Sequence, residues 1–163
     1  MLTKFVIDTN VAINANGKTK KGEPAQGSPE CQLICSKLLA NCKDIHIVLD
    51  DKNLIMSEYR KNLCHNEQPL GNAFFKYLHN HQYSSDKIHT VTITPLNDNS
   101  YDFAELPENT FDKSDRKFIA TAVVAQAIIL YSADKEDWKK VEQSGLIGNL
   151  QIQLKDLCPN DCK

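Results

Sequence analysis

Phe5-Val6-Ile7-Asp8-Thr9-Asn10, near the N-terminus, has the pattern of a central strand with a polar end. Three apolar, β-prone residues run directly into an aspartate and two small polar residues, which predicts a buried strand ending at Asp8. Ligand sites in open α/β sheets lie beyond the carboxyl ends of the strands, so Asp8 is a candidate site residue. The alternative is that Asp8 only caps the turn that follows, since Asx turns are common.

Length and composition are those of an ordinary globular domain. The chain has 163 residues, of which 41% are hydrophobic and 25% are charged, so we expect one domain over 1–163. No apolar run approaches the about 20 residues that a membrane helix needs. The N-terminus lacks the pattern of a secretory signal, and we therefore expect a cytoplasmic protein with no membrane partner.

Charge and cysteine content narrow the function further. The net charge is -2, so any nucleic-acid binding has to use local basic patches. The chain has six cysteines. Cys31, Cys35 and Cys42 share one helical face, where a free thiol behaves as a small hydrophobe. A lone Cys-x-x-x-Cys pair is a weak zinc signal, so we expect reduced structural thiols.

Apolar strands alternate with amphipathic helices along the chain, which predicts an α/β fold with parallel strands joined by helices. We expect a three-layer sandwich with a central, mostly parallel sheet. A polar segment at 16–27 contains three lysines and three glycines and predicts a mobile loop. The strands are predicted near 5–7, 45–49, 87–94, 127–133 and 150–154, and the helices near 11–15, 29–42, 52–63, 69–81, 112–126 and 134–144.

Four carboxylates recur at related places in this pattern. Asp8 and Asp134 each end an apolar strand, and Asp115 begins the inward face of a predicted helix. Glu58 follows Leu54 and Ile55 by one helical turn, so it lies beside the core, where an uncompensated carboxylate is costly. If the strands are parallel, Asp8, Asp134 and Asp115 gather at one end of the sheet.

A cluster of carboxylates repels itself unless a cation neutralises it. Oxygen ligands without histidine favour Mg²⁺ or Mn²⁺. Such a cation can activate water and stabilise charge on a phosphate. Each acid also has a structural alternative: Asp112 and Asp134 can cap helices, and Glu136 and Asp137 are expected to be solvated charges in a first helical turn.

In order and spacing, the motifs resemble those of PIN-domain nucleases over nearly the whole chain. They are Asp8-Thr9-Asn10 after a strand, the inward Glu58, Asp115-Arg-Lys-Phe-Ile-Ala-Thr-Ala122 and Ser132-Ala-Asp134-Lys-Glu-Asp-Trp138. The resemblance implies a PIN-like fold and Mg²⁺- or Mn²⁺-dependent cleavage of RNA. It implies a catalytic and metal-binding set of Asp8, Glu58, Asp115 and Asp134, with Asn10, Asp112 and Ser132 beside it.

Within that family the chain is similar to the VapC-like toxins of toxin–antitoxin pairs, which implies an antitoxin partner and admits a homodimer. A compact toxin of this kind lacks the insertion at 16–27 and the long connection at 97–109. These departures count against the toxin role more than against the nuclease chemistry.

Basic residues near the acidic motifs are candidates for holding the RNA backbone. They are Lys18, Lys20, Lys21 and Arg116, although Arg116 can equally be a surface charge. One alternative function is a catalytically weak RNA- or protein-binding module with the same fold. Another is a phosphatase, but a phosphoaspartate enzyme would need an aspartate where Asn10 stands.

Overall fold

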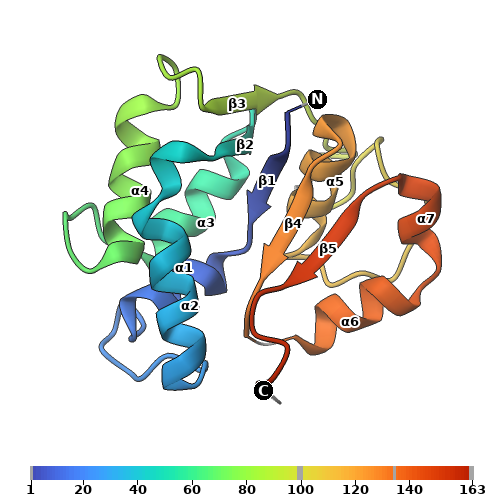
Figure 1. The fold of residues 1–163 in the computed structure, drawn as a ribbon. Coiled ribbons are helices and arrows are strands. Elements are labelled where there is room, and N and C mark those ends of the chain that lie inside the picture. The colour runs from blue at the N-terminus through green and yellow to red at the C-terminus, as the bar shows by residue number, and fades with distance from the viewer. Residues whose placement is uncertain (1, 99–100, 134, 162–163) are drawn as a thin grey trace.

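Five parallel strands form the centre of the molecule in a computed structural model, which describes residues 2–98, 101–133 and 135–161 (Figure 1). Their order in the sheet is β3-β2-β1-β4-β5. Strand β1 lies in the middle because Val6 and Ile7 are apolar and fully buried, which suits a strand covered on both faces. The strands are β1 (Lys4–Ile7), β2 (His46–Asp50), β3 (Ile88–Val91), β4 (Ile128–Tyr131) and β5 (Gln153–Asp156).

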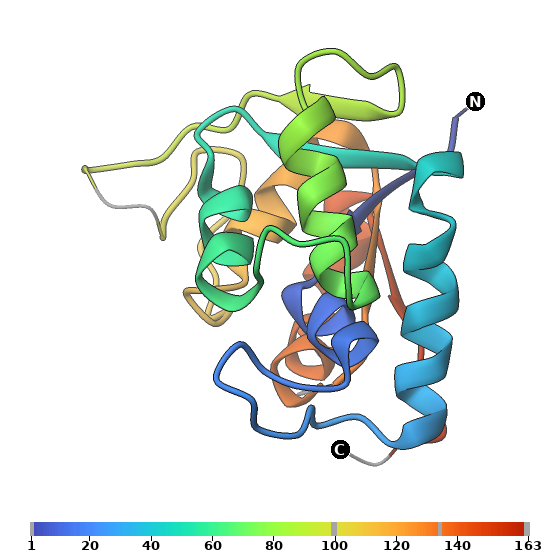
Figure 2. The ribbon, with the colours of Figure 1, turned by 90° about the vertical axis from the view of Figure 1, so that its left-hand side faces the viewer.

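Helices cover both faces of the sheet, as Figures 1 and 2 show from two directions. Helices α1, α2 and α4 pack together on one face, and α3 and α5 contact the sheet on the other. The predicted three-layer α/β sandwich is therefore confirmed, with a sheet that is parallel throughout. The helices are α1 (Thr9–Asn16), α2 (Pro29–Ala40), α3 (Leu54–Asn62), α4 (Leu70–His81), α5 (Arg116–Ala125), α6 (Glu136–Gln143) and α7 (Leu146–Leu150), with a 3₁₀ turn at Cys42–Asp44.

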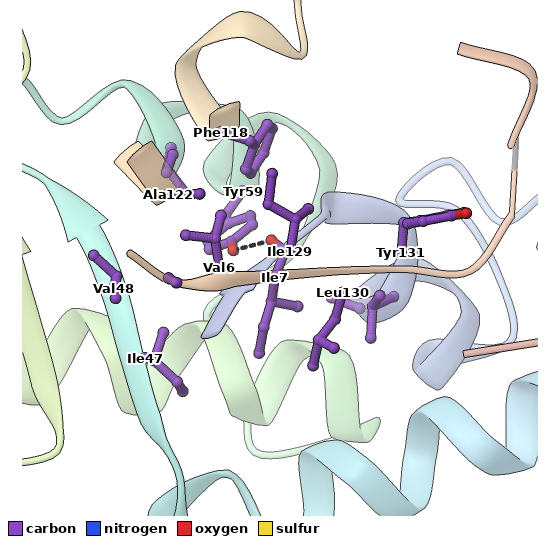
Figure 3. Close-up of a cluster of buried hydrophobic side chains, with 14 of the residues drawn as sticks. Val6, Ile7, Ile47, Val48, Tyr59, Phe118, Ala122, Ile129, Leu130 and Tyr131 are labelled. Atoms are coloured by element: carbon purple, nitrogen blue, oxygen red, sulfur yellow. Dashed lines mark hydrogen bonds between the residues drawn. The ribbon is translucent and has the colours of Figure 1, made fainter. Parts of the chain in front are cut away.

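Side chains from both helical layers meet the sheet in the core (Figure 3). Phe118 of α5 and Tyr59 of α3 lie on one face of the strands, whereas Leu130 and Ile47 point to the opposite face. The Tyr59 hydroxyl donates a hydrogen bond to the carbonyl of Ile7. This bond joins α3 to the last residue of β1, so it sets where α3 lies relative to the end of that strand.

Two predicted elements differ from those observed. Helix α5 begins at Arg116 and not at Asp112, because residues 112–115 form a turn in which the Ser114 amide donates to the Asp112 carboxylate. The strand expected at 150–154 is β5 at 153–156, and α7 precedes it. Gly145, with a φ of 78°, separates α6 from α7, a conformation that glycine adopts without steric cost.

The segment 16–27 is a loop, as predicted, but hydrogen bonds give it a defined course. Lys18 and Pro24 form an isolated antiparallel bridge, and the amide of Thr19 donates to the carbonyl of Glu23 at 2.7 Å. Lys20 Nζ donates to the carbonyl of Arg60 at 2.9 Å. The loop therefore lies against the end of α3 and does not simply extend into solvent.

The prediction that the cysteines are all reduced thiols is wrong for two of them. Cys31 in the first turn of α2 and Cys158 after β5 form a disulfide across 127 residues. The spacing of the two cysteines in the sequence does not indicate this pairing, because only the tertiary fold brings them together. Cys35 and Cys42 are free and buried, and desolvation raises the pKa of each thiol to about 11. Cys162 lies outside the described residues.

The segment after β5, as far as residue 161, is joined to the start of α2 by hydrogen bonds as well as by the disulfide. The hydroxyl and amide of Ser28, which caps α2, both donate to the Asp161 carboxylate, at 2.5 and 2.8 Å. The buried Lys135 reaches the same tail through Asp156 and the carbonyls of Cys158 and Asp161. Among the residues that the structure describes, no helix has the length and apolar character that crossing a membrane requires.

Candidate functional site

Asp8 lies at the carboxyl end of β1 and is 4% exposed. It is the N-cap of α1, where its carboxylate accepts a hydrogen bond from the Asn10 amide at a rather long 3.3 Å. The same side chain lines a polar pocket beyond the strand ends. The two interpretations of the sequence are therefore compatible, since Asp8 caps a helix and also contributes a carboxylate to the pocket.

Glu58 reaches the same pocket from α3 and is electrostatically compensated there. Its Oε1 lies 2.7 Å from Lys117 Nζ, and its Oε2 accepts a hydrogen bond from the Thr9 hydroxyl. The neighbouring Tyr59 ties α3 to β1, which holds Glu58 beside Asp8. The sequence argument identified the cost of burying Glu58, but it did not identify Lys117 or Thr9 as the groups that offset this cost.

Asp115 occupies the N-cap position of α5, but its side chain makes no capping hydrogen bond. The residue is only 9% exposed. Burial, and after it the charges of Asp8, Asp112 and Asp137, together raise the pKa of its carboxyl group to about 8. A carboxyl group in this position is thus largely protonated at neutral pH unless a positive charge enters the pocket.

Asp137 is a site residue that the sequence analysis missed. The sequence predicts a solvated charge in the first turn of α6. Asp137 does lie in that turn, but it is half-buried and lines the pocket. Carboxylate oxygens of Asp112, Asp115 and Asp137 lie within 4.8 Å of one another. The available signal was the position of Asp137 directly before Trp138, whose burial orients this turn toward the sheet.

The resulting acidic pocket has a volume of about 160 Å³. Carboxylates reach it from the end of β1, from α3, from the turn before α5 and from the first turn of α6. Its described lining consists of Asp8, Thr9, Asn10, Ile13, Glu58, Asn62, Ser114, Asp115, Asp137 and Trp138. We refer to this set as the acidic pocket.

The donor set fits a hard divalent cation. Mg²⁺ and Mn²⁺ prefer oxygen ligands, and the acidic pocket offers carboxylate, hydroxyl and amide oxygens with no histidine or cysteine in its described lining. Burial raises the pKa of Asp115 most, and the like charges of the neighbouring carboxylates add to this increase. A cation would relieve this repulsion and favour the ionised carboxylate.

Three of the predicted neighbouring residues have clear positions. Asn10 lines the acidic pocket, and its amide lies 3.5 Å from the carbonyl of Ala133. Asp112 is exposed and accepts hydrogen bonds from the Ser114 amide and hydroxyl, so it shapes the turn that presents Asp115. Ser132 is fully buried and accepts a hydrogen bond from Asn14 at 2.9 Å, which connects β4 to α1.

The predicted basic residues lie elsewhere. Arg116 donates to the carbonyl of Phe111 and pairs with Asp102 at 2.5 Å, so it braces the connection before α5. Lys18, Lys20 and Lys21 are absent from the described lining of the acidic pocket. The lysine that does approach the acidic pocket is Lys117, which pairs with Glu58 and was not among the predicted residues. Asp134, predicted as a metal ligand, lies outside the described residues.

No protein-family model matches the chain, and no curated protein matches it. A solved structure that is similar is the crystal structure of VapBC2 from Rickettsia felis bound to a DNA fragment from their promoter, with 10% sequence identity and a TM-score of 0.41. The match covers 94% of this chain and 98% of that one.

Proposed function

We propose that the protein is a metal-dependent ribonuclease that hydrolyses phosphodiester bonds at the acidic pocket. One observation carries the proposal: four carboxylates from separate segments converge on one small polar pocket at the carboxyl ends of a parallel sheet. This is where open α/β sheets bind ligands. The PIN-like order of motifs in the sequence points to the same chemistry.

The residues of the acidic pocket have different proposed roles. Asp8, Asp115 and Asp137 would supply the oxygen ligands of a divalent cation, and the sequence adds Asp134 to this set. When bound, Mg²⁺ or Mn²⁺ supplies a Lewis acid that activates water and balances charge on the phosphate. Asp115 must lose its proton to serve as a ligand. Thr9 and Lys117 hold Glu58 in place and keep its charge compensated.

Cleavage of a labelled single-stranded RNA tests this proposal. We expect cleavage with Mg²⁺ or Mn²⁺, none with excess EDTA, and a loss of at least about 100-fold for Asp8→Asn and Asp115→Asn, the lower end of the loss when one group that stabilises the transition state electrostatically is removed. Asp44→Asn is the matched control, because Asp44 is exposed and precedes β2 at the opposite end of the sheet. Full activity in EDTA, or in a folded Asp115→Asn variant, would exclude the metal mechanism.

A binding module without catalysis is a second candidate, favoured by the ion pair between Lys117 and Glu58, which occupies one of the carboxylates. The same assay separates the two functions when RNA binding is measured alongside cleavage. Binding without cleavage at any metal concentration would favour the module.

A toxin role is a narrower proposal, drawn from the resemblance to VapC-like proteins. We expect growth arrest when the wild-type chain is expressed in a bacterial host and no arrest with Asp115→Asn. Rescue by a small protein encoded next to this chain would identify the antitoxin partner. Normal growth with active wild-type enzyme would exclude the toxin role and leave the nuclease chemistry intact.

A further inference from the structure

A second hollow opens directly beside the acidic pocket. It has a volume of about 430 Å³ and shares Glu58, Asn62 and Ser114 with that pocket. Its remaining lining comes from α3, from the connection before α5 and from α5 itself, and consists of Leu54, Ser57, Lys61, Tyr101, Lys113 and Lys117. We call it the lysine–tyrosine pocket. A volume in the range of about 300–1,000 Å³ is typical of small-ligand sites.

The charge of the lysine–tyrosine pocket is opposite to that of its neighbour. Three lysines line it, although the chain as a whole is slightly acidic. Lys117 is committed to Glu58 and to the carbonyl of Ser114. Lys61 and Lys113 are exposed, and together they put positive charge next to a cluster of carboxylates. An anionic chain could run over these lysines while one of its phosphates reaches the acidic pocket.

Tyr101 adds an aromatic surface to this hollow. Its side chain is 48% exposed, and Lys113 Nζ lies 5.6 Å from its ring centroid. Single-stranded nucleic acids are held by this combination of basic groups that follow the phosphates and aromatic rings on which bases stack. A paired base cannot offer its face to such a ring, so the arrangement favours an unpaired nucleotide.

We infer that the lysine–tyrosine pocket binds an unpaired nucleotide of the RNA substrate, with its base on Tyr101 and adjoining phosphates against Lys61 and Lys113. This inference rests on the proposed nuclease function, because it names the substrate subsite beside the same acidic pocket.

Binding of a fluorescent single-stranded oligoribonucleotide, measured by anisotropy in EDTA, tests the inference without cleavage. Tyr101→Ala should weaken binding about tenfold, within the range of one stacked base, and Tyr101→Phe should restore it. Tyr83→Ala is the matched control, since Tyr83 is 88% exposed and lies in the turn before β3. An oligomer of abasic residues should bind wild type and Tyr101→Ala equally.

The lysines are tested by the salt dependence of the same binding. The double variant Lys61→Ala, Lys113→Ala should flatten the slope of log K against log salt by about 1.4, or about 0.7 for each phosphate contact. Lys43→Ala, at an exposed position in the 3₁₀ turn, should leave the slope unchanged. Thermal melts of all variants confirm that they are folded.

The outcomes separate this inference from the nuclease proposal. Equal binding by wild type and Tyr101→Ala, or no binding by wild type, overturns the subsite even if RNA is cleaved. Binding that depends on Tyr101 without any cleavage supports the subsite and overturns the nuclease.

Discussion

At the scale of single residues, Asp115 and Lys117 carry the electrostatics of the acidic pocket. Asp115 is a buried carboxyl group with a pKa of about 8, and Lys117 is the cation that compensates Glu58. In the absence of metal, one proton and one ammonium group offset part of the negative charge. Removing either group should therefore change the stability of the metal-free protein in a predictable direction.

Asp115→Asn should stabilise the metal-free protein as the pH rises. The unfolded chain ionises this carboxyl near 3.8 and the folded chain near 8. Between these values the folded state binds the extra proton, so wild-type stability falls with increasing pH. Asparagine has no proton to lose, so the variant's advantage should grow by about 2–4 kcal/mol between about pH 5 and about pH 8. Urea unfolding in EDTA at several pH values measures the difference in free energy of unfolding between the variant and the wild type. A difference that does not change with pH would contradict the raised pKa of Asp115.

Lys117→Met should destabilise the metal-free protein by about 1–3 kcal/mol, between the values for exposed and buried ion pairs. The pair is largely shielded, with side chains 13% and 21% exposed. The variant should also bind Mn²⁺ more tightly, because Glu58 loses its internal cation. Lys140→Met is the matched control, since its pair with Glu136 is 66% and 81% exposed and should contribute almost nothing. Calorimetry measures both properties.

At the scale of elements, α2 and the segment after β5 form one unit that the sequence does not reveal. Cys31 and Cys158 join them covalently, and Ser28 and Asp161 join them by hydrogen bonds. Lys135, the N-cap residue of α6, donates hydrogen bonds to two carbonyl groups of the same segment. The start of α6, and with it Asp137, is thus anchored to the end of the chain.

Reduction of the disulfide should lower stability by about 2–5 kcal/mol, because the link closes a long loop in the unfolded chain. Melts with and without a thiol reductant measure the effect. A Cys31→Ser, Cys158→Ser double variant should match the reduced wild type and ignore the reductant, whereas Cys64→Ser should respond like wild type. Identical melts with and without reductant would mean that this bond does not form in the isolated protein.

At the scale of the whole molecule, the acidic pocket joins segments from the first tenth of the chain to its last quarter. Its described lining extends from Asp8 to Trp138 and comes from both sides of the sheet. A cation bound there would connect β1, α5 and α6 in the folded state only. Metal binding should therefore be visible as global stabilisation.

Saturating Mn²⁺ should raise the free energy of unfolding of the wild type, by about 2.7 kcal/mol at one hundred times the dissociation constant. Asp8→Asn and Asp137→Asn should gain less, because each removes a proposed oxygen ligand. Asp44→Asn should gain as much as wild type. If Mn²⁺ stabilises Asp137→Asn as much as wild type, Asp137 is not a metal ligand and is a solvated charge, as the sequence predicts.

The parallel sheet and the helices that cover it follow from the pattern of the amino-acid sequence. Apolar runs such as Phe5–Ile7 and Ile128–Tyr131 are too hydrophobic for an exposed strand, and their alternation with helices leaves few topologies other than a parallel sheet. The helix predicted from residue 29 is α2, which begins at Pro29 with Ser28 as its N-cap. The end of β1 also made Asp8 a site candidate, since parallel strands present their last residues at one edge.

The pairing of side chains that are distant in the sequence depends on the tertiary structure. Lys117 meets Glu58 across 59 residues, and Cys31 meets Cys158 across 127. Local patterns cannot specify such contacts, because these depend on how α3, α5 and the C-terminal tail are placed around the sheet. The position of Asp137 at the pocket was not predicted for the same reason: one turn of α6 faces either solvent or pocket according to where Trp138 packs. The periodicity of the sequence indicates the helices and strands, whereas tertiary packing determines which charged side chains are in contact.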